Sequence, residues 1–483
     1  MRERNTWFGG SSRVGGLRRW TSGLVVGVAM ACGAGALAPA LAEAHGIWGH
    51  IHVTAWAIEN LPPGELRDFF EDPEVRNAAY FGAAFTDSGY WPNANEDAAR
   101  TYGEHTHWEP FVEDYIQWML ANDAAPFESR ESKLRVAFLI GAASHGLQDE
   151  IFDSYMLDFT YENDGGGQEE TDPGTDGFLV LDDYTQVIPE PWLPMDVLLE
   201  LYEGLDAGVT EDVIRGGVNT MMNVYVSEFG QKVAAGLGRS YASKIPWTRA
   251  HYMDPEIPGS LRSEIVPTAA YIGALWDRLN DRFDEDSLVI HAFPEASRRL
   301  LTGDSSSIGS VSMMIFGKGV EDTSLDAELV DDEGLPIEHS TLSNRWGGGA
   351  GKLTRLVRIR PEEDLAEGEW YTARLVPGLR LAGGAVTEAT HSYRYQVRCD
   401  SDDDVRCPEL DEVPPPIMRL PMEDEPNEEP PPPPTDEEDG AASSDGCAAS
   451  ASPGAVAWVW ALAAAGCLVV RRRGARGRVR TRA

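Results

Sequence analysis

The hydrophobic pattern of this 483-residue chain changes once, near Asp286, and this change constrains the fold more than any other feature. Between residues 50 and 283, apolar side chains recur at spacings of three and four, which is the period of an amphipathic helix. After residue 286 they alternate in short runs that Gly and Asp turns divide, which is the period of a half-buried strand. We therefore expect a multidomain chain in which an all-α domain is followed by a β-sandwich.

The expected helices cover 50–61, 112–122, 132–149, 195–205, 210–237 and 265–283, and the expected strands cover 287–291, 311–316, 354–359 and 371–376. In the second part, segment 365–371 precedes a strand and segment 379–384 follows it, an order that resembles bacterial immunoglobulin-like (Ig-like) domains. This part has no evident catalytic cluster. The residues that point to chemistry lie in the first part.

Both ends of the chain carry patterns typical of export. Five arginines precede an apolar run at 23–41, and Ala42, Glu43 and Ala44 follow, as in a cleaved secretory signal. A membrane anchor is the alternative interpretation of this end. At the other end, seven arginines follow the apolar run 453–470, which predicts a membrane-spanning segment with its basic end in the cytoplasm.

The C-terminal tail also resembles the sorting tails of exported myxobacterial proteins, in which a Cys, an apolar run and a group of Arg follow one another. This resemblance implies that the tail is processed at Cys447 and that the mature protein keeps a modified Cys447. We expect an exported protein anchored at the cell surface or the outer membrane. Cys399 and Cys407 remain between signal and tail, and in an exported chain this pair is expected to form a small disulfide loop.

The chain is strongly acidic, with 79 Asp and Glu against 40 Lys and Arg and a net charge of −39. Such a charge repels phosphate backbones, so duplex nucleic acid is excluded as a partner unless bound cations intervene. Part of the charge lies in 400–439, where 16 acidic residues and two Arg alternate with runs of Pro. This segment is expected to be a stiff, self-repelling linker.

A group of histidines and carboxylates marks the first part. Six of the ten His lie between residues 45 and 145, namely His45, His50, His52, His105, His107 and His145. A single His is usually a surface or core polar residue, but His145 and Asp149 stand four apart in an apolar helix, so they share one face and can hold one ion or bridge two. A buried hydrogen bond explains this pair alone nearly as well. Asp153 adds a third ligand candidate one turn later, and Asp87 adds a carboxylate from a loop.

At these residues the chain resembles the zinc-dependent phospholipase C superfamily, which includes single-strand nucleases and the N-terminal domain of glycosylphosphatidylinositol-specific phospholipase D. The resemblance covers 45–283 and is most specific at 106–111 and 137–149. It implies an all-α fold with three zinc ions that hydrolyses phosphodiesters. Carried over residue by residue, it makes Asp87, His107, His145 and Asp149 the first zinc site, with Asp87 and Asp149 as catalytic residues. Asp149 would bridge to a second ion held by His50 and by the new N-terminus at His45, created by cleavage after Ala44.

The third metal site of that family is altered in this chain. Its candidate ligands are Asp153, Asp172 and Asp176, and an alternative register uses Gln168 and Asp172. Three carboxylates favour calcium or magnesium over zinc. Two further alternatives are an empty site with weakened or lost catalysis, and an acidic loop at 163–176 that is solvated and mobile.

We expect a monomeric zinc-dependent phosphodiester hydrolase that acts on phospholipid or glycolipid and contacts the membrane through its tail. A single-strand nuclease is an alternative, because Tyr90, Trp91 and Trp108 can stack on a base or lie among lipid chains. A non-catalytic metal-containing surface protein is another. The expected organisation is a signal peptide at 1–44, the α domain at 45–285, the Ig-like domain at 286–399, the linker at 400–446 and the tail at 447–483.

Overall fold

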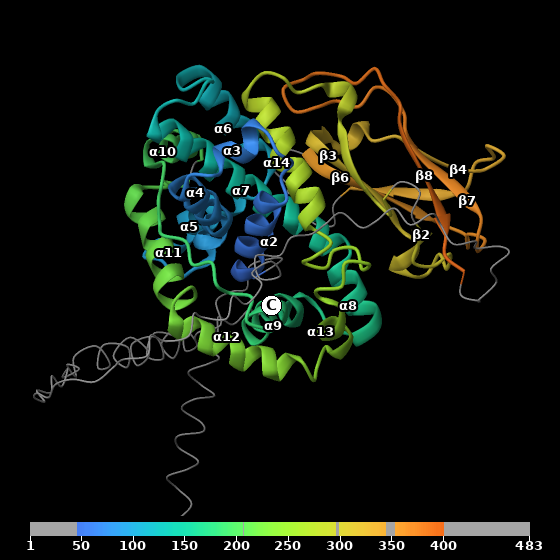
Figure 1. Ribbon diagram of the computed structural model, residues 1–483, viewed down its shortest axis with the longest axis horizontal. Helices are drawn as coiled ribbons and strands as arrows, with labels where there is room; N and C mark the ends of the chain where they lie inside the picture. The colour runs from blue at the N-terminus through green and yellow to red at the C-terminus, as the bar shows by residue number, and fades with distance from the viewer. Residues whose placement is uncertain (1–45, 206, 296–298, 344–352, 400–483) are drawn as a thin grey trace, which may run out of the picture. The chain divides into compact units, whose positions relative to one another are not determined.

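The computed structural model describes residues 46–205, 207–295, 299–343 and 353–399, which lie within one compact unit of the chain (Figure 1). The expected signal peptide, acidic linker and C-terminal tail lie outside these residues, as do His45, Cys407 and Cys447. None of the described helices is long and apolar enough to cross a membrane. The membrane-spanning segment expected at 453–470 is not among them.

The first described region is helical, as the sequence predicts. Its elements are α2 (Ile47–Glu59), α3 (Glu65–Phe69), α4 (Pro73–Phe85), the 3-10 helix η1 (Thr86–Tyr90), α5 (Glu96–Thr106), α6 (Glu109–Asn122), α7 (Arg130–Ser154), α8 (Met156–Asp164), α9 (Gln168–Leu181), α10 (Met195–Glu203), α11 (Glu211–Val224), α12 (Glu228–Tyr241), α13 (Pro246–His251) and α14 (Ile265–Leu279). The single helix predicted at 210–237 is wrong, because the chain breaks between α11 and α12. There the side chain of Ser227 accepts from Gly230 N and caps the new helix.

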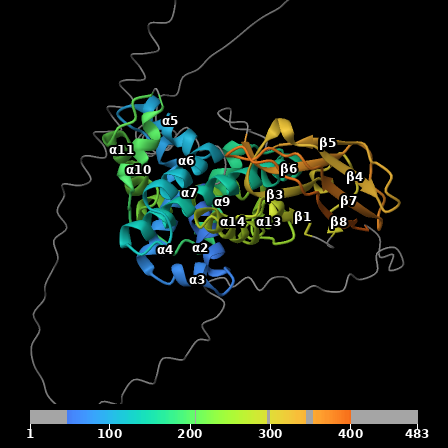
Figure 2. The ribbon, with the colours of Figure 1, turned by 90° about the horizontal axis from the view of Figure 1, so that it is seen from above.

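Helix α7 is buried over most of its length, and α4 packs along it (Figure 2). The two helices come unusually close because each has a Gly at the crossing. A Cβ atom on Gly82 would lie 2.3 Å from Phe138 O, and one on Gly141 would lie 1.9 Å from Ala79 O. Such a close approach brings backbone carbonyls of α4 within reach of side chains on α7.

The second described region consists of strands, again as predicted. Its elements are η2 (Glu285–Ser287), β1 (Val289–Phe293), β2 (Arg299–Leu300), η3 (Ile308–Ser310), β3 (Ser312–Glu321), η4 (Asp322–Ser324), β4 (Ala327–Asp331), β5 (His339–Leu342), β6 (Leu353–Pro361), β7 (Trp370–Leu375) and β8 (His391–Val397). They form one sheet in the order β1-β3-β6-β5 and another in the order β2-β8-β7-β4. Residues of both sheets, including Phe316 and Tyr395, share a hydrophobic core. The Ig-like classification remains a prediction.

The helical and strand regions also share a core. Met313 and Ile315 of β3 and Leu356 of β6 belong to the same cluster of buried side chains as the helices. The hydroxyl of Tyr155, just after α7, donates to Val311 O at 2.8 Å. In the described part of the chain, the strands therefore pack on the helices that carry the functional residues.

Candidate metal centre

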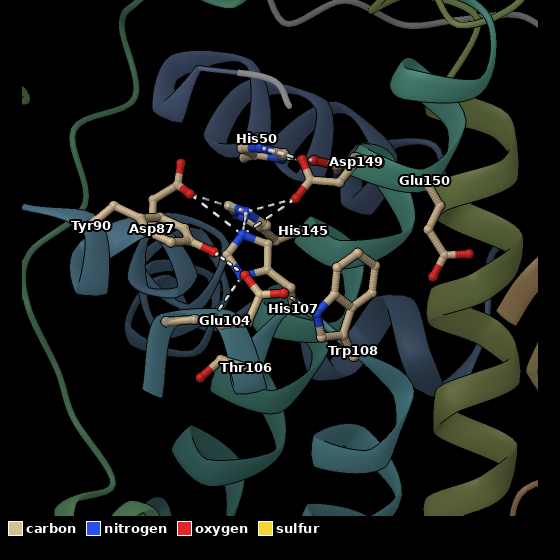
Figure 3. A network of polar contacts seen from close by, with 12 residues as sticks. His50, Asp87, Tyr90, Glu104, Thr106, His107, Trp108, His145, Asp149 and Glu150 are labelled. Atoms are coloured by element: carbon tan, nitrogen blue, oxygen red, sulfur yellow. Dashed lines mark hydrogen bonds and ion pairs between the residues drawn. The ribbon is translucent and has the colours of Figure 1, made fainter. Parts of the chain in front are cut away.

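Five side chains from four separate segments meet inside the helical region (Figure 3). They are His50 on α2, Asp87 on η1, His107 directly after α5, and His145 and Asp149 on α7. Each of them is at most 4% exposed. Two groups within this set are close enough to hold an ion, one of Asp87, His107 and His145 and one of His50, His145 and Asp149.

The two imidazole nitrogens of the first group and the carboxylate oxygens that face them are spaced as zinc ligands are. Nε2 of His107 and Nε2 of His145 lie 3.2 Å apart. Asp87 Oδ1 lies 3.5 and 3.6 Å from these two nitrogens, and Asp149 Oδ2 lies 3.4 and 3.3 Å from them. Zinc ligands at about 2.0–2.2 Å from the ion form a tetrahedron with edges of about 3.3–3.6 Å. The ligand atoms of Asp87, His107 and His145 can therefore share one ion, and Asp149 Oδ2 approaches the same two imidazole nitrogens.

The protonation of the two imidazoles supports the same conclusion. His107 Nδ1 lies 2.7 Å from Gly103 O, and His145 Nδ1 lies 2.6 Å from Ala83 O on α4. A carbonyl oxygen only accepts, so each Nδ1 carries a hydrogen and, in a neutral ring, Nε2 presents its lone pair. Two lone pairs that face each other at 3.2 Å repel unless a metal ion or a proton lies between them. The residues present thus fit a bound metal ion.

His50 and Asp149 extend the cluster to a second position. His50 Nε2 lies 3.0 Å from Asp149 Oδ1, whereas Oδ2 of the same carboxylate faces the first group. His50 Nδ1 lies 2.9 Å from Gln148 Oε1, and the amide nitrogen of Gln148 donates to Thr54 Oγ1 at 3.0 Å, which orients the amide. Asp149 thus offers one oxygen to each position, the arrangement of a bridging carboxylate.

Charges within the cluster shift the pKa values of its members. Burial opposes the charged form of His107, but the carboxylates of Asp87 and Asp149 raise its pKa to about 9. Burial likewise opposes protonation of His50, and Asp149 nevertheless raises its pKa. The pKa of Asp149 is lowered by His145 and His50 despite its burial. A metal ion must therefore compete with protons for these atoms.

One buried oxygen of the cluster has no hydrogen-bond donor. Asp87 is 1% exposed, and its Oδ2 atom has no hydrogen-bond partner among the residues that the structure describes. A buried carboxylate oxygen without a donor costs free energy, so such atoms are normally paired. A cation or a proton from a bound molecule would satisfy it.

The candidate ligands of the third site are arranged differently. Asp153 on α7 and Asp172 on α9 are buried, but in the described chain neither belongs to a group of three close ligands. The carboxylate of Asp176 accepts from Trp48 N at 3.1 Å, from Gly49 N at 2.9 Å and from the hydroxyl of Tyr225. It therefore caps the N-terminus of α2, where Gly46 has no side chain to do so.

Gln168, the ligand candidate of the alternative register, begins α9 and is partly buried. The alternative of a solvated loop at 163–176 is wrong from Gln168 onward, because that stretch is helical.

Two of the histidines singled out from the sequence, His52 and His105, lie outside the candidate metal groups. His52 is saturated by the protein, because Nδ1 lies 2.8 Å from Trp48 O and Nε2 accepts from Val187 N at 3.3 Å. His105 packs its ring against Phe111 and Tyr202. Spacing in the sequence could not separate these residues from the ligands.

The sequence pattern missed Glu264, which lies one residue before α14 and is fully buried. Burial raises its pKa well above the usual range, and the nearby charges of Asp149 and Asp153 act in the same direction. It thus adds a carboxyl group beside the bridging residue. An isolated Glu in a loop has no periodic signal by which it could be found.

A rim of aromatic side chains lies beside His107 (Figure 3). The exposed carboxylate of Glu104 accepts from the hydroxyl of Tyr90 at 2.9 Å and from Nε1 of Trp108 at 3.0 Å. The ring centres of Tyr90 and Trp108 lie 5.4 and 6.2 Å from that of His107. Trp91, the third aromatic residue singled out from the sequence, instead packs on Tyr225. Cys399 is disulfide-bonded, and Cys407, its expected partner, lies outside the described residues.

Comparisons with known proteins give distant similarity to one kind of enzyme. No family model matches this chain. The chain is 24% identical over 226 residues to phosphatidylinositol-glycan-specific phospholipase D of Rattus norvegicus and 25% identical over 222 residues to that of Mus musculus. Each alignment covers 43% of this chain and 26% of the relative, so the chain spans about a quarter of the length of these relatives.

Solved structures give only weak likenesses. CopC from Methylosinus trichosporium OB3b has 16% identity and a TM-score of 0.19, over 24% of this chain and 96% of CopC. The S-layer protein SbsC has 11% identity and a TM-score of 0.18, over 72% of this chain and 45% of that structure. Likenesses this weak identify neither a fold nor a function. What the geometry and the comparisons give together is distant similarity to a phospholipase and buried His and Asp groups that can hold a metal ion.

Proposed function

We propose that this protein is a zinc-dependent phosphodiester hydrolase. The observation that carries the proposal is the pair of Nε2 atoms of His107 and His145, which lie 3.2 Å apart. Oxygens of Asp87 and Asp149 lie 3.3–3.6 Å from both nitrogens, which is the spacing of zinc ligands. Because Asp149 also faces His50, the cluster offers positions for two ions. Paired ions are a common device of enzymes that cleave phosphate esters.

The chain's own residues would divide the work. His107 and His145 are held by backbone carbonyls, so their rings keep Nε2 directed at the metal position. Asp87 would hold the metal ion through Oδ1, and its second oxygen, which has no hydrogen-bond partner among the described residues, would take a proton from the attacking water. Bound zinc would lower the pKa of that water to about 7 and neutralise the developing charge on the phosphodiester oxygens.

We propose a phospholipid or a glycolipid as the substrate. Tyr90 and Trp108 give the rim an apolar character, and Glu104 between them is acidic. This rim suits a lipid whose head group carries an amine, whereas the carboxylate and the net charge of −39 disfavour a nucleic acid strand. The distant similarity to phosphatidylinositol-glycan-specific phospholipase D supports the same choice.

Metal counting and hydrolysis assays on the purified full chain test the proposal. Two zinc ions per chain are expected, and a third equivalent of zinc, calcium or magnesium would indicate an occupied third site. Hydrolysis would be measured on phosphatidylcholine, phosphatidylinositol, a glycosylphosphatidylinositol-anchored protein and single-stranded DNA. Cleavage of a lipid substrate that a chelator abolishes and zinc restores is the expected result.

Variants at neighbouring histidines give a matched control. His145→Ala should abolish metal-dependent hydrolysis, whereas His105→Ala should retain it, because His105 contacts aromatic side chains and no ligand. Turnover of DNA alone would favour a single-strand nuclease, and metal binding without turnover would favour a surface binding protein. Unchanged hydrolysis in His145→Ala would contradict the assignment of the site.

We also propose that the protein is exported, acts as a monomer and is held at the cell surface by its C-terminal tail. The sequence patterns of the two ends are the support for this proposal. A mature chain that begins at His45 would supply a free amino group five residues before His50. N-terminal sequencing of the exported protein tests this, and any other first residue would contradict it.

A further inference from the structure

A fully buried arginine reaches from the strand region into the helices that carry the ligands. Arg355 on β6 is 0% exposed. Its Nε donates to Glu150 Oε1 at 2.8 Å, and its backbone N–H donates to Glu150 Oε2 at 3.0 Å. Glu150 directly follows the bridging residue Asp149 on α7, and Figure 3 shows the two carboxylates pointing in different directions. The turn of α7 that carries Asp149 is thus tied to β6.

The same guanidinium also holds the backbone of a ligand. Nη2 of Arg355 donates to His107 O at 2.7 Å, and Nη1 donates to Ala143 O at 3.3 Å. His107 follows the last turn of α5, where carbonyl groups lack partners within the helix. Arg355 therefore joins the carbonyl of one ligand residue to the segment of α7 that carries two others.

The guanidinium of Arg355 and the carbonyl of His107 lie so close to α7 that only a glycine fits at residue 146. A Cβ atom at Gly146, the residue after His145, would lie 2.1 Å from His107 O and 2.6 Å from Arg355 Nη2. Any larger residue there would force His107 and α7 apart. The planar fork of arginine spreads several donors in fixed directions, which the single ammonium group of lysine cannot reproduce.

A second buried carboxylate repeats the arrangement two residues after His107. Glu109 accepts from Gly319 N on β3 at 3.1 Å, and it pairs with Arg278 on α14 at 2.7 Å. Glu109 is 1% exposed, and Arg278 is 6% exposed. The carbonyl of His107 is therefore fixed by a contact to β6, and Glu109, two residues later, is fixed by a contact to β3.

We propose that Arg355 is a positioning residue of the metal centre, through which the strand region fixes His107 and the ligand-bearing turns of α7 in metal-binding geometry. Metal ligands must be held closely in place by a surrounding shell, and changes in that shell typically cost about 10- to 100-fold in metal affinity. The strand region then acts as part of the metal centre. The proposal rests on metal binding and not on hydrolysis.

Zinc affinity of the full chain, measured by competition with a chromophoric chelator, tests this proposal. Arg355→Met is expected to weaken zinc binding by about 10- to 100-fold. Arg355→Lys should recover part of the loss, because it restores the charge but not the fork. The visible spectrum of the Co²⁺-loaded protein should change in Arg355→Met, since it reports the geometry of the ligands.

Arg358 provides a matched control on the same strand. It is 7% exposed and donates to Ser154 O at 3.1 Å and to Asp158 Oδ2 at 3.3 Å. These two bonds join β6 to the helices and involve neither His107 nor Glu150. Arg358→Met should lower the urea midpoint of the metal-free protein as Arg355→Met does. Its zinc affinity should stay within about twofold of the wild type, because no ligand residue moves.

Equal losses of zinc affinity in the two Met variants, or an unchanged Co²⁺ spectrum in Arg355→Met, would overturn the proposal. If Arg355→Met does not fold, Glu150→Gln removes the charge of the partner and keeps its shape, and it should give the same spectral change. A Glu150→Gln protein with wild-type affinity and spectrum would also overturn it. Absence of zinc binding in the wild type would overturn both this proposal and the proposed function, whereas binding without hydrolysis would overturn the function alone.

Discussion

Two kinds of buried polar side chain lie close together in the helical region, and they differ in how the protein satisfies them. His52 and Asp176 have their polar atoms engaged by backbone and side-chain groups of the protein. His107 and His145 are satisfied on one side only, and their Nε2 atoms converge on two carboxylates. Burial and residue type are alike in both kinds. The difference teaches that a buried metal ligand is recognised by a donor atom that no hydrogen-bond donor of the protein engages.

The largest expected effect is the change in the free energy of unfolding that zinc binding produces. Zinc at about 1,000 times its dissociation constant stabilises a folded protein by about 4 kcal/mol when the unfolded chain does not bind it. Asp149→Asn should remove this gain, because Asp149 gives one oxygen to each metal position. Urea unfolding with zinc and with a chelator measures the effect. Full zinc-dependent stabilisation in Asp149→Asn would contradict the division between the two kinds of residue.

His52 sharpens the comparison through pH. Burial lowers its pKa from 6.5 to about 4, against a weaker opposing effect of its bond to Trp48 O. Between these two values the unfolded chain binds a proton at His52 and the folded chain does not, so stability falls as the pH is lowered. This contribution reaches about 3 kcal/mol. The free energy of unfolding is measured by urea unfolding in the presence of a chelator. In His52→Gln, its decrease between pH 7 and pH 4 should be smaller than in the wild type by that amount. An unchanged decrease would show that the pKa of His52 is the same in the folded and the unfolded chain.

The close crossing of α4 and α7 provides the next test. Gly141→Ala would place a Cβ atom 1.9 Å from Ala79 O, so the helices must separate, at a cost of about 1–3 kcal/mol. Separation would also pull Ala83 O from His145 and weaken zinc binding. Gly273→Ala is the control, because a Cβ atom there meets nothing within 4 Å and should stabilise α14 by about 0.5–1 kcal/mol. Equal stability of the two variants would argue against the tight crossing.

The smallest effect is expected at Asp176. Asp176→Asn should cost about 1–2 kcal/mol, because the carboxylate caps the N-terminus of α2. It should leave the number of bound metal ions unchanged. Thermal unfolding and metal counting measure the two quantities. Loss of one metal equivalent in this variant would instead support the register in which Asp176 is a ligand of the third site.

The local periodicity of the sequence was enough for the order of the two regions and for the face shared by His145 and Asp149. A spacing of four fixes neighbours on a helix whatever surrounds it. It was not enough to separate α11 from α12, because the interruption depends on a single capping residue, Ser227. It also gave no sign that residues 168–181 form a helix.

Only the tertiary structure shows that the candidate ligands named by the resemblance lie close enough to hold an ion. Asp87, His107 and His50 reach α7 from three other segments, and Gly82 and Gly141 let α4 come close enough to orient His145. In the tertiary structure Asp176 also caps a helix N-terminus, and Arg355, on a strand more than 200 residues away in the sequence, contacts His107. The chain by itself determined residue types and local spacing, because these act over a few residues. The hydrogen-bond partners of a buried side chain, and the atoms that remain available to a metal ion, depend on contacts between distant segments, which no local pattern encodes.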